Sequence, residues 1–176
     1  HRLDRDTSGL LMVAEKRSVL RDLHDQLREG RIRKTYVALL SGRLKGAAHT
    51  VTAPLHKGSL PNGERIVRVS RDGKEALTEF KVIDRIGNTT LVEASPKTGR
   101  THQIRVHAQF LGHPLVGDEK YGIDDFNRAM KSYGANRLFL HARDLKVRPS
   151  GATSYLDLTC PLETDLEAVL ENLRRG

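Results

Sequence analysis

Acidic and basic side chains alternate at the start of the chain, in the stretch His1-Arg2-Leu3-Asp4-Arg5-Asp6-Thr7-Ser8-Gly9. Arginines on both sides of Asp4 favour the ionised form of its carboxylate, and an ionised carboxylate can act as a nucleophile or as a general base. The second acid, Asp6, would suit a two-carboxylate hydrolase, but two acids this close in a loop usually form only a charged turn. On these residues alone, a solvated charge cluster and an active site both stay open.

The stretch resembles the active-site motif of the RluA-type pseudouridine synthases, His-Arg-Leu-Asp-x-x-Thr-Ser-Gly, at every defined position. Further blocks follow in the order found in this family, at residues 34–38 (Lys-x-Tyr-x-Ala), 96–114 and 138–142. Residues 63–74 also resemble the RluC branch, whose members act on large-subunit ribosomal RNA. Because four blocks follow in the family's order across most of the chain, the probability that they match by chance is very small.

The resemblance implies a role for each matching residue. Asp4 is then the catalytic carboxylate, Arg105 its ion-pair partner, and Tyr36 the ring that stacks on the target base. Arg2 is expected to fill the gap that a uridine leaves when it is extruded from stacked RNA. The other expected site residues are Arg100, His102 and Gln103 as RNA contacts, and Leu138 and Leu140 as walls of the base pocket. For the two leucines and for Tyr36, ordinary core or strand packing is the alternative.

Pseudouridylation needs little equipment. The glycosidic bond of uridine breaks, the uracil turns while it is held, and a new bond forms through carbon 5, with no redox change and no outside group. One ionised carboxylate can do this by attacking the sugar or base, or by abstracting a sugar proton, and the sequence does not choose between these routes. Two other functions stay open: an RNA-binding or ribosome-assembly module without activity, and a phosphodiesterase or glycosidase that acts on nucleic acid.

No motif in the sequence predicts a metal or a nucleotide cofactor. His102 and His107 are five residues apart, which places them on different faces of a helix and on opposite faces of a strand. The chain has one cysteine and no His-Glu-x-x-His string, and its loop glycines lack the spacing of a phosphate-binding turn. We therefore expect catalysis without a metal or a small-molecule cofactor.

Charge and length fit an RNA-binding domain. The 176 residues carry 30 Lys and Arg against 22 Asp and Glu, which gives a net charge of +8 and a pI near 9.9. Such a surplus attracts polyanions, nucleic acid above all. No apolar run approaches the roughly 20 residues that span a bilayer, and the single cysteine, Cys160, is predicted to be a buried thiol in a reducing cytosol. We expect a soluble, monomeric, cytoplasmic protein with ribosomal RNA as its partner and no membrane contact.

We expect residues 1–176 to form a single catalytic domain. Members of the family normally carry a strand segment with a Lys-Pro turn before the first motif, and many RluC-type members also carry a small RNA-binding domain ahead of it. The sequence contains neither segment. The chain is therefore expected to be an N-terminally incomplete part of a longer enzyme.

Hydrophobic periodicity and turn residues predict an α+β fold. A helix is expected between a capping Ser18 and a terminating Gly30, with three leucines on one face, and an amphipathic helix is expected over residues 166–173. A hairpin turn is predicted at Gly87-Asn88. The predicted strands cover residues 10–14, 35–40, 67–70, 77–84, 89–94 and 155–160. The family resemblance implies a bent, mixed, largely antiparallel sheet flanked by helices, with a cleft across its middle.

Residues 100–112 fit either a strand or a helix. A helix is favoured because Thr101 can cap its start, Ile104 and Ala108 fall on one apolar stripe with Leu111, and Gly112 can end it. In the helix Arg105 lies in the first turn, where the helix dipole favours a nearby anion such as Asp4.

Overall fold

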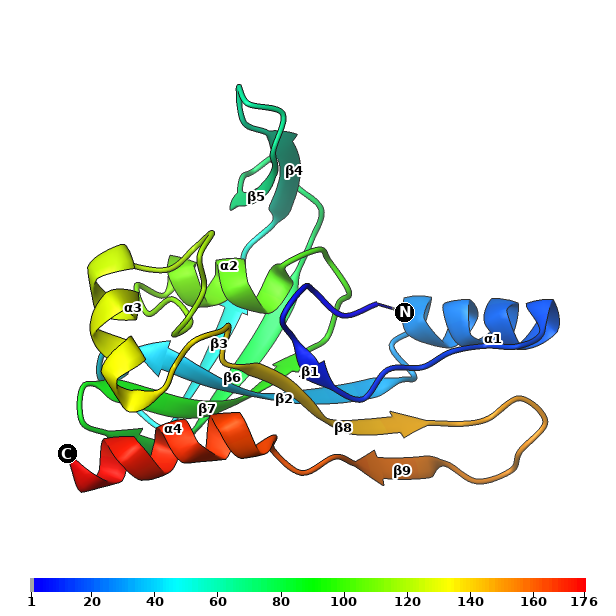
Figure 1. The fold of residues 1–176 in the computed structure, drawn as a ribbon. Helices are drawn as coiled ribbons and strands as arrows, with labels where there is room; N and C mark the ends of the chain where they lie inside the picture. Colours follow the sequence, from blue (N-terminus) through cyan, green and yellow to red (C-terminus); the bar gives the residue numbers. More distant parts are fainter. Residues whose placement is uncertain (1) are drawn as a thin grey trace.

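A mixed sheet lies at the centre of the computed structural model, which describes residues 2–176. Its strands are β1 (Ser8–Gly9), β2 (Arg33–Ser41), β3 (Ala48–Thr52), β6 (Leu77–Ile86), β7 (Thr89–Pro96), β8 (Leu140–Val147) and β9 (Leu156–Thr159). They are arranged in the order β1-β8-β2-β7-β6-β3, with β9 also paired to β8 (Figure 1). The β1–β8 pair is parallel and the other pairs are antiparallel. The predicted α+β fold with a mixed, largely antiparallel sheet is therefore confirmed.

Helices cover both faces of this sheet (Figure 1). The helical elements are α1 (Arg17–Arg28), α2 (Gln103–Phe110), α3 (Asp124–Met130), the short 3-10 helix η1 (Lys131–Tyr133) and α4 (Thr164–Arg175). Strand β2 shows how the two layers meet, because its side chains alternate between the faces. Tyr36, Ala38 and Leu40 share a core cluster with α2, whereas Val37 and Leu39 share one with α4. The strand is buried on both sides and holds the residues next to it firmly in place.

Several predicted elements are present. Strands over residues 35–40, 77–84 and 89–94 are confirmed as β2, β6 and β7, and the turn at residues 87–88 joins the last two, with Ile86 paired to Thr89. The C-terminal amphipathic helix is α4, and its four apolar side chains are buried. Helix α1 ends before Gly30, which has a φ of +66°. It begins at Arg17 after Lys16, so Ser18 is not its cap, and that prediction is wrong.

The strand predicted over residues 10–14 does not form. Gly9 is the last residue of β1 that pairs with β8. The Leu10 N–H then donates a hydrogen bond to the Ala142 carbonyl, and beyond it the chain moves away from β8. From Asp144 onward the same edge of β8 is occupied by β9, so no partner is left for a longer β1. Leu11 and Val13 are 52% and 80% exposed, and the apolar run is not a buried strand.

Strand β9 and Cys160 are also more exposed than expected. The strand predicted over residues 155–160 is present as β9, but all four of its residues are exposed because it lies at the edge of the sheet. The thiol of Cys160 is partly exposed and not buried. Among residues 2–176, every helix is too short or too polar to span a lipid bilayer.

Strands β4 (Leu55–Ser59) and β5 (Arg65–Val69) form a separate two-stranded hairpin. Figure 1 shows it projecting from the body of the molecule above α2. Part of strand β5 was predicted from the sequence, whereas strands β3, β4 and β8 were not. Helix α2 contacts the base of the hairpin, where Val106 packs with Leu55 and Val67.

The helical alternative for residues 100–112 is confirmed. Ile104 and Ala108 are buried, and Gly112 follows the helix with a φ of +79°. The N-terminal boundary differs from the prediction, because the residue before the helix is His102, in the left-handed conformation with a φ of 53°, and Thr101 makes no capping bond. This turn directs the His102 side chain toward the cleft described next.

Candidate active site

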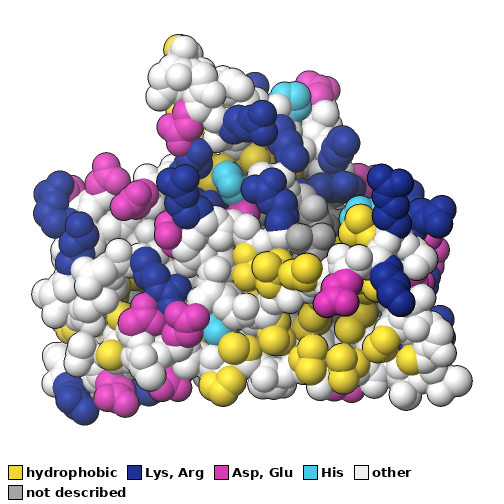
Figure 2. Space-filling view, turned by 45° about the vertical axis from the view of Figure 1, so that its right-hand side comes forward, with side chains coloured by type: hydrophobic (Ala, Val, Ile, Leu, Met, Phe, Trp, Pro, Cys, Tyr) yellow, Lys and Arg dark blue, Asp and Glu magenta, His cyan; other side chains and the backbone are white. Residues whose placement is uncertain are grey.

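A cleft of about 550 Å³ opens beside the start of β2. Its walls come from residues 2–7, the end of α1, the first half of β2, and residues 96–104 between β7 and α2. Among its described lining residues, Asp4 is the one carboxylate against five Lys and Arg side chains. Figure 2 shows Lys and Arg gathered on the face below the hairpin. The cleft therefore combines an acidic group with a surface that attracts a polyanion.

A tight turn positions Asp4. The Thr7 N–H donates to the Asp4 carbonyl at 3.1 Å, and Asp6 between them has a φ of 65°. Asp6 is exposed and does not line the cleft, which agrees with the charged-turn interpretation. The Asp4 side chain is 17% exposed and its Oδ2 lies 3.5 Å from Arg105 Nη1. The first residue of the motif, His1, lies outside the described residues.

Arg105 is held mainly by a second carboxylate, Asp118, which the sequence analysis missed. Arg105 Nε and Nη2 donate to Asp118 at 2.7 and 2.8 Å, in a bidentate pair. The Asp118 side chain is fully buried and also accepts the N–H groups of Lys120 and Tyr121. Burial opposes its charge, but Arg105 and these N–H groups hold the pKa of Asp118 below its usual value. The one sequence signal for this residue was an acid in the glycine-flanked turn 117–122.

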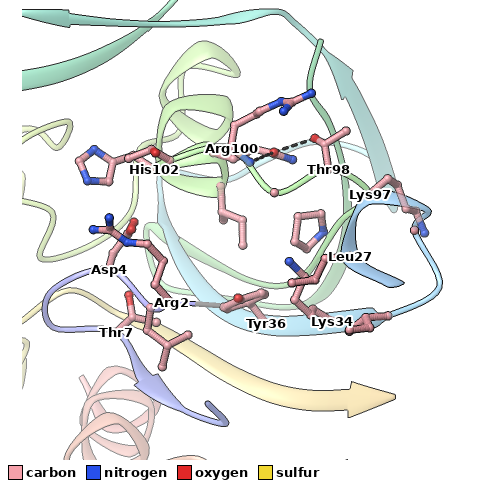
Figure 3. A pocket seen from close by; sticks show the side chains of 18 of the residues that line it. Arg2, Asp4, Thr7, Leu27, Lys34, Tyr36, Lys97, Thr98, Arg100 and His102 are labelled. Atoms are coloured by element: carbon pink, nitrogen blue, oxygen red, sulfur yellow. Dashed lines mark hydrogen bonds between the residues drawn. The ribbon is translucent and has the colours of Figure 1, made fainter. Parts of the chain in front are cut away.

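Tyr36 lies on the floor of the cleft, and the residue is 8% exposed (Figure 3). Burial, with a smaller contribution from the charge of Asp4, raises the pKa of Tyr36 to about 12. The phenol is therefore neutral at physiological pH. A neutral ring beside a carboxylate offers a flat surface on which a pyrimidine can stack without competing for the proton chemistry.

His102 and Tyr121 link the cleft to the hairpin. His102 Nδ1 lies 2.7 Å from the Tyr121 hydroxyl, which also accepts the Val67 N–H at 3.0 Å. Tyr121 in turn lies under the Arg105 guanidinium, 4.9 Å from the ring centroid. Burial lowers the pKa of His102. The negative charge of Asp4 raises this pKa, and the positive charge of Arg105 lowers it. His102 is thus a neutral wall of the cleft at physiological pH.

Gln103 lines the cleft as expected but bonds inside the protein, and Leu138 does not line the cleft. Gln103 is buried, and its amide bonds to Thr98 Oγ1, the Arg100 N–H, the Leu77 carbonyl and Thr78 Oγ1. Both donors and the carbonyl oxygen are used inside the protein, so its side chain orders the 96–101 loop and has no free group for RNA. Leu138 belongs to the core cluster behind the cleft, which is the alternative that the sequence left open.

The remaining predicted residues do line the cleft. Figure 3 shows Arg2 beside Asp4 on one side, Arg100 and His102 on another, and Tyr36 on the floor. Leu140 also lines it. Arg100 Nε donates to the Glu75 carbonyl at 2.9 Å, which leaves part of its guanidinium free. The structure therefore brings Arg2, Asp4, Tyr36, Arg100, His102 and Leu140 together, with Arg105 directly behind Asp4.

Arg137, just before the fourth block, and His141 within it hold the loop that carries Asp4. Arg137 Nη1 donates to the Asp6 carbonyl at 3.2 Å, while its other nitrogens pair with Asp165 and Glu163 at the start of α4. The buried His141 Nδ1 lies 2.8 Å from Ser8 Oγ. Neither Arg137 nor His141 was assigned a role from the sequence.

Within residues 2–176, no three His, Cys, Asp or Glu side chains form a group that could hold a metal ion. His102 and His107 point to different places, since His107 is buried between Thr78 and the Ala53 carbonyl.

Comparison with known proteins decides the family. The model of the RNA pseudouridylate synthase family matches residues 1–110. The chain belongs to this family. The matched residues 1–110 include the first motif, Tyr36 and Arg105.

Individual relatives agree with this family. A protein named ribosomal large subunit pseudouridine synthase C from Escherichia coli (strain K12) is 51% identical over 178 residues, which cover 100% of this chain and 56% of that protein. A protein of the same name from Haemophilus ducreyi is 48% identical over 174 residues, 99% of this chain and 54% of that protein. The chain thus spans about half the length of these curated relatives.

Solved structures show the same fold. Human RNA pseudouridylate synthase domain containing 1 superposes with a TM-score of 0.81 at 29% identity, over 96% of this chain and 71% of that chain. Human RNA pseudouridylate synthase domain containing 4 superposes with a TM-score of 0.79 at 30% identity, over 99% and 74%. The pseudouridine synthase fold implied by the sequence resemblance is confirmed.

Proposed function

We propose that this chain is the catalytic domain of an RNA pseudouridine synthase that isomerises specific uridines in large-subunit ribosomal RNA. The observation that carries the proposal is the position of Asp4, whose carboxylate is paired with Arg105 and opens into a basic cleft floored by Tyr36. The names of the bacterial relatives support the choice of ribosomal RNA as the substrate. The proposal includes one catalytic domain over residues 1–176, a monomeric state and a cytoplasmic location.

The reaction is assigned to a few side chains. The target uridine leaves the RNA stack, and Arg2 at the cleft edge occupies the space it vacates. Its uracil stacks on Tyr36, and the Asp4 carboxylate acts on the nucleoside as nucleophile or base. The bond from the sugar to N1 breaks, the bond from the sugar to C5 forms, and the proton lost from C5 is balanced by one gained at N1. No cofactor takes part in this scheme.

Replacing Asp4 tests this proposal. We expect Asp4→Asn to abolish pseudouridine formation and to change RNA affinity by only a few fold, because an amide keeps the shape but can act neither as nucleophile nor as base. Formation is measured by carbodiimide labelling and mass spectrometry on a large-subunit ribosomal RNA fragment treated with this chain.

Asp6→Asn is the matched control, since Asp6 lies on the same turn, is exposed, and has the left-handed conformation that Asn tolerates. It should retain activity. If Asp4→Asn turns over RNA as fast as the unmodified chain, Asp4 takes no part in the mechanism. If the unmodified chain releases free uracil, the enzyme is a glycosidase and not a synthase.

A further inference from the structure

Lys34 carries a charge that nothing in the described protein neutralises. Its ammonium lines the cleft, yet among residues 2–176 no carboxylate lies within 4 Å of Nζ and no hydrogen bond to it is formed. Two nearby cations, Lys97 and Arg105, do have carboxylate partners. Lys97 pairs with Glu79 at 2.8 Å, and Arg105 is held by Asp118. Lys34 is thus a cleft cation with its full charge available to a ligand.

The position of Lys34 follows from strand geometry. Lys34 precedes Tyr36 by two residues on β2, so both side chains leave the same face of the strand. Figure 3 shows the two next to each other, with Asp4 on the far side of Tyr36. Gly99 lies opposite, where an added Cβ would be 3.9 Å from Nζ. A ligand that stacks on Tyr36 therefore passes directly beside this ammonium.

The free protein bears a cost for this arrangement. Burial lowers the pKa of Lys34, which means that the surroundings disfavour its charged form and provide no compensating anion. An unpaired and partly desolvated charge does not stabilise a fold. A methionine of similar length would fit the same space without this cost, so packing does not explain a lysine here.

We propose that Lys34 binds a backbone phosphate of the RNA strand next to the uridine that stacks on Tyr36. A lysine ammonium is a compact point charge that suits a single phosphate group. The inference rests on the proposed function for the identity of the base, and it adds a phosphate subsite on the side of Tyr36 that is away from Asp4. The subsite fixes the register of the strand, and thereby which nucleotide reaches the catalytic carboxylate.

The first test is the salt dependence of RNA binding. Lys34→Met is compared with the unmodified chain on a single-stranded RNA oligonucleotide that contains one uridine. Loss of one phosphate contact is expected to lower the slope of log K against log salt by about 0.7 and to weaken binding by roughly tenfold at low salt. Lys34→Arg should restore the slope. Lys131→Met is the control, because Lys131 is exposed on η1 outside the cleft and has no ion pair within residues 2–176.

The second test identifies the phosphate. Oligonucleotides with a neutral methylphosphonate at one linkage at a time are bound to both forms of the protein. One linkage beside the uridine should weaken binding to the unmodified chain and have no effect on Lys34→Met. An unchanged salt slope, with a loss of affinity that no linkage reproduces, would instead assign Lys34 to a uracil carbonyl and overturn the proposal.

Thermal unfolding separates binding from structure. Lys34→Met is expected to unfold at the same Tm as the unmodified chain or at a higher one, because an unpaired and partly desolvated charge is removed. A lower Tm with unchanged RNA affinity would make Lys34 a structural residue. These measurements need no turnover, so a chain that forms no pseudouridine would contradict the proposed function and still leave the phosphate subsite to be judged by binding.

Discussion

Two carboxylates share one guanidinium at the centre of the site, and their geometry differs. Asp118 takes two short hydrogen bonds from Arg105, while Asp4 lies 3.5 Å from the remaining nitrogen. The bidentate pair fixes the plane of Arg105 and leaves Asp4 oriented but only loosely bound. A carboxylate held this way is oriented and still has an oxygen available to a substrate.

At the residue scale, Arg105→Met is expected to reduce turnover more than RNA binding, because its nearest partners are carboxylates and not phosphates. The variant should also unfold more easily, by about 3–5 kcal/mol, since it leaves Asp118 buried without its counter-charge. Urea unfolding measures the second effect, and single-turnover kinetics with RNA measures the first.

The double variant Arg105→Met/Asp118→Asn separates the two roles of Arg105. It removes the unpaired charge of Asp118, so it should recover part of the lost stability without recovering turnover. Recovery of turnover together with stability would show that Arg105 acts on the fold alone. A shallower salt dependence of RNA binding with turnover intact would show that Arg105 is a phosphate contact.

At the scale of elements, the loop that carries Asp4 is tied to a helix far away in sequence. Arg137 connects the Asp6 carbonyl to Asp165 and Glu163 at the start of α4. The loop itself is short, and Asp6 has a left-handed backbone, which is uncommon for non-glycine residues although Asp tolerates it better than most. Arg137 is therefore a positioning residue, because it acts on Asp4 through the turn and does not line the cleft.

We expect Arg137→Met to lower kcat by about ten- to a hundredfold with little change in KM, because small displacements of a reacting group are costly whereas the binding surface stays intact. Steady-state kinetics gives both constants. Arg128→Met is a matched control, since Arg128 forms an exposed pair with Asp125 on α3, away from the loop. A rise in KM with kcat unchanged would place Arg137 among the RNA contacts.

At the scale of the whole molecule, helix α2 joins the sheet, the hairpin and the cleft. Its His107 is fully buried, with Nε2 2.9 Å from the Ala53 carbonyl and Nδ1 2.8 Å from Thr78 Oγ1. The carbonyl can only accept, so Nε2 carries the proton and Nδ1 accepts from the Thr78 hydroxyl. Burial lowers the pKa of His107, and the ring is neutral in the folded protein.

The buried His107 should make stability depend on pH. The unfolded chain binds a proton at this site below the ordinary value of 6.5, whereas the folded protein resists it, so unfolding gains protons and the free energy of unfolding falls as pH decreases from 6.5. The slope from this one group is at most about 1.4 kcal/mol per pH unit until the folded pKa is reached. Urea unfolding between pH 5 and 8, a range of about 3 units around the ordinary pKa of His, measures it.

His107→Gln supplies the reference for this measurement, because glutamine can donate to Ala53 and does not titrate. The difference in unfolding free energy between the two proteins should shrink or reverse as pH falls. A difference that stays constant across the range would show that His107 keeps its ordinary pKa in the folded state.

The sequence by itself identified the family and several of the regular elements. The motif around Asp4 and the blocks containing Tyr36 and Arg105 predicted the family, which the comparisons confirmed. Strands β2, β6 and β7, the turn after Ile86 and the amphipathic α4 could be read directly, because alternation and helical periodicity record which face of an element is buried.

Only the tertiary structure decided which groups serve the site and which serve the core. Residues 10–14 fail to form a strand because β9 occupies the edge of β8, and the Gln103 amide bonds to four neighbours inside the protein. The pairing of Asp118 with Arg105 depends on contact across 13 positions, and the link from Arg137 to Asp6 spans 131. Local pattern reports the propensity of a segment, whereas these contacts arise from competition among distant segments for the same partners, so they are defined only when the chain is folded.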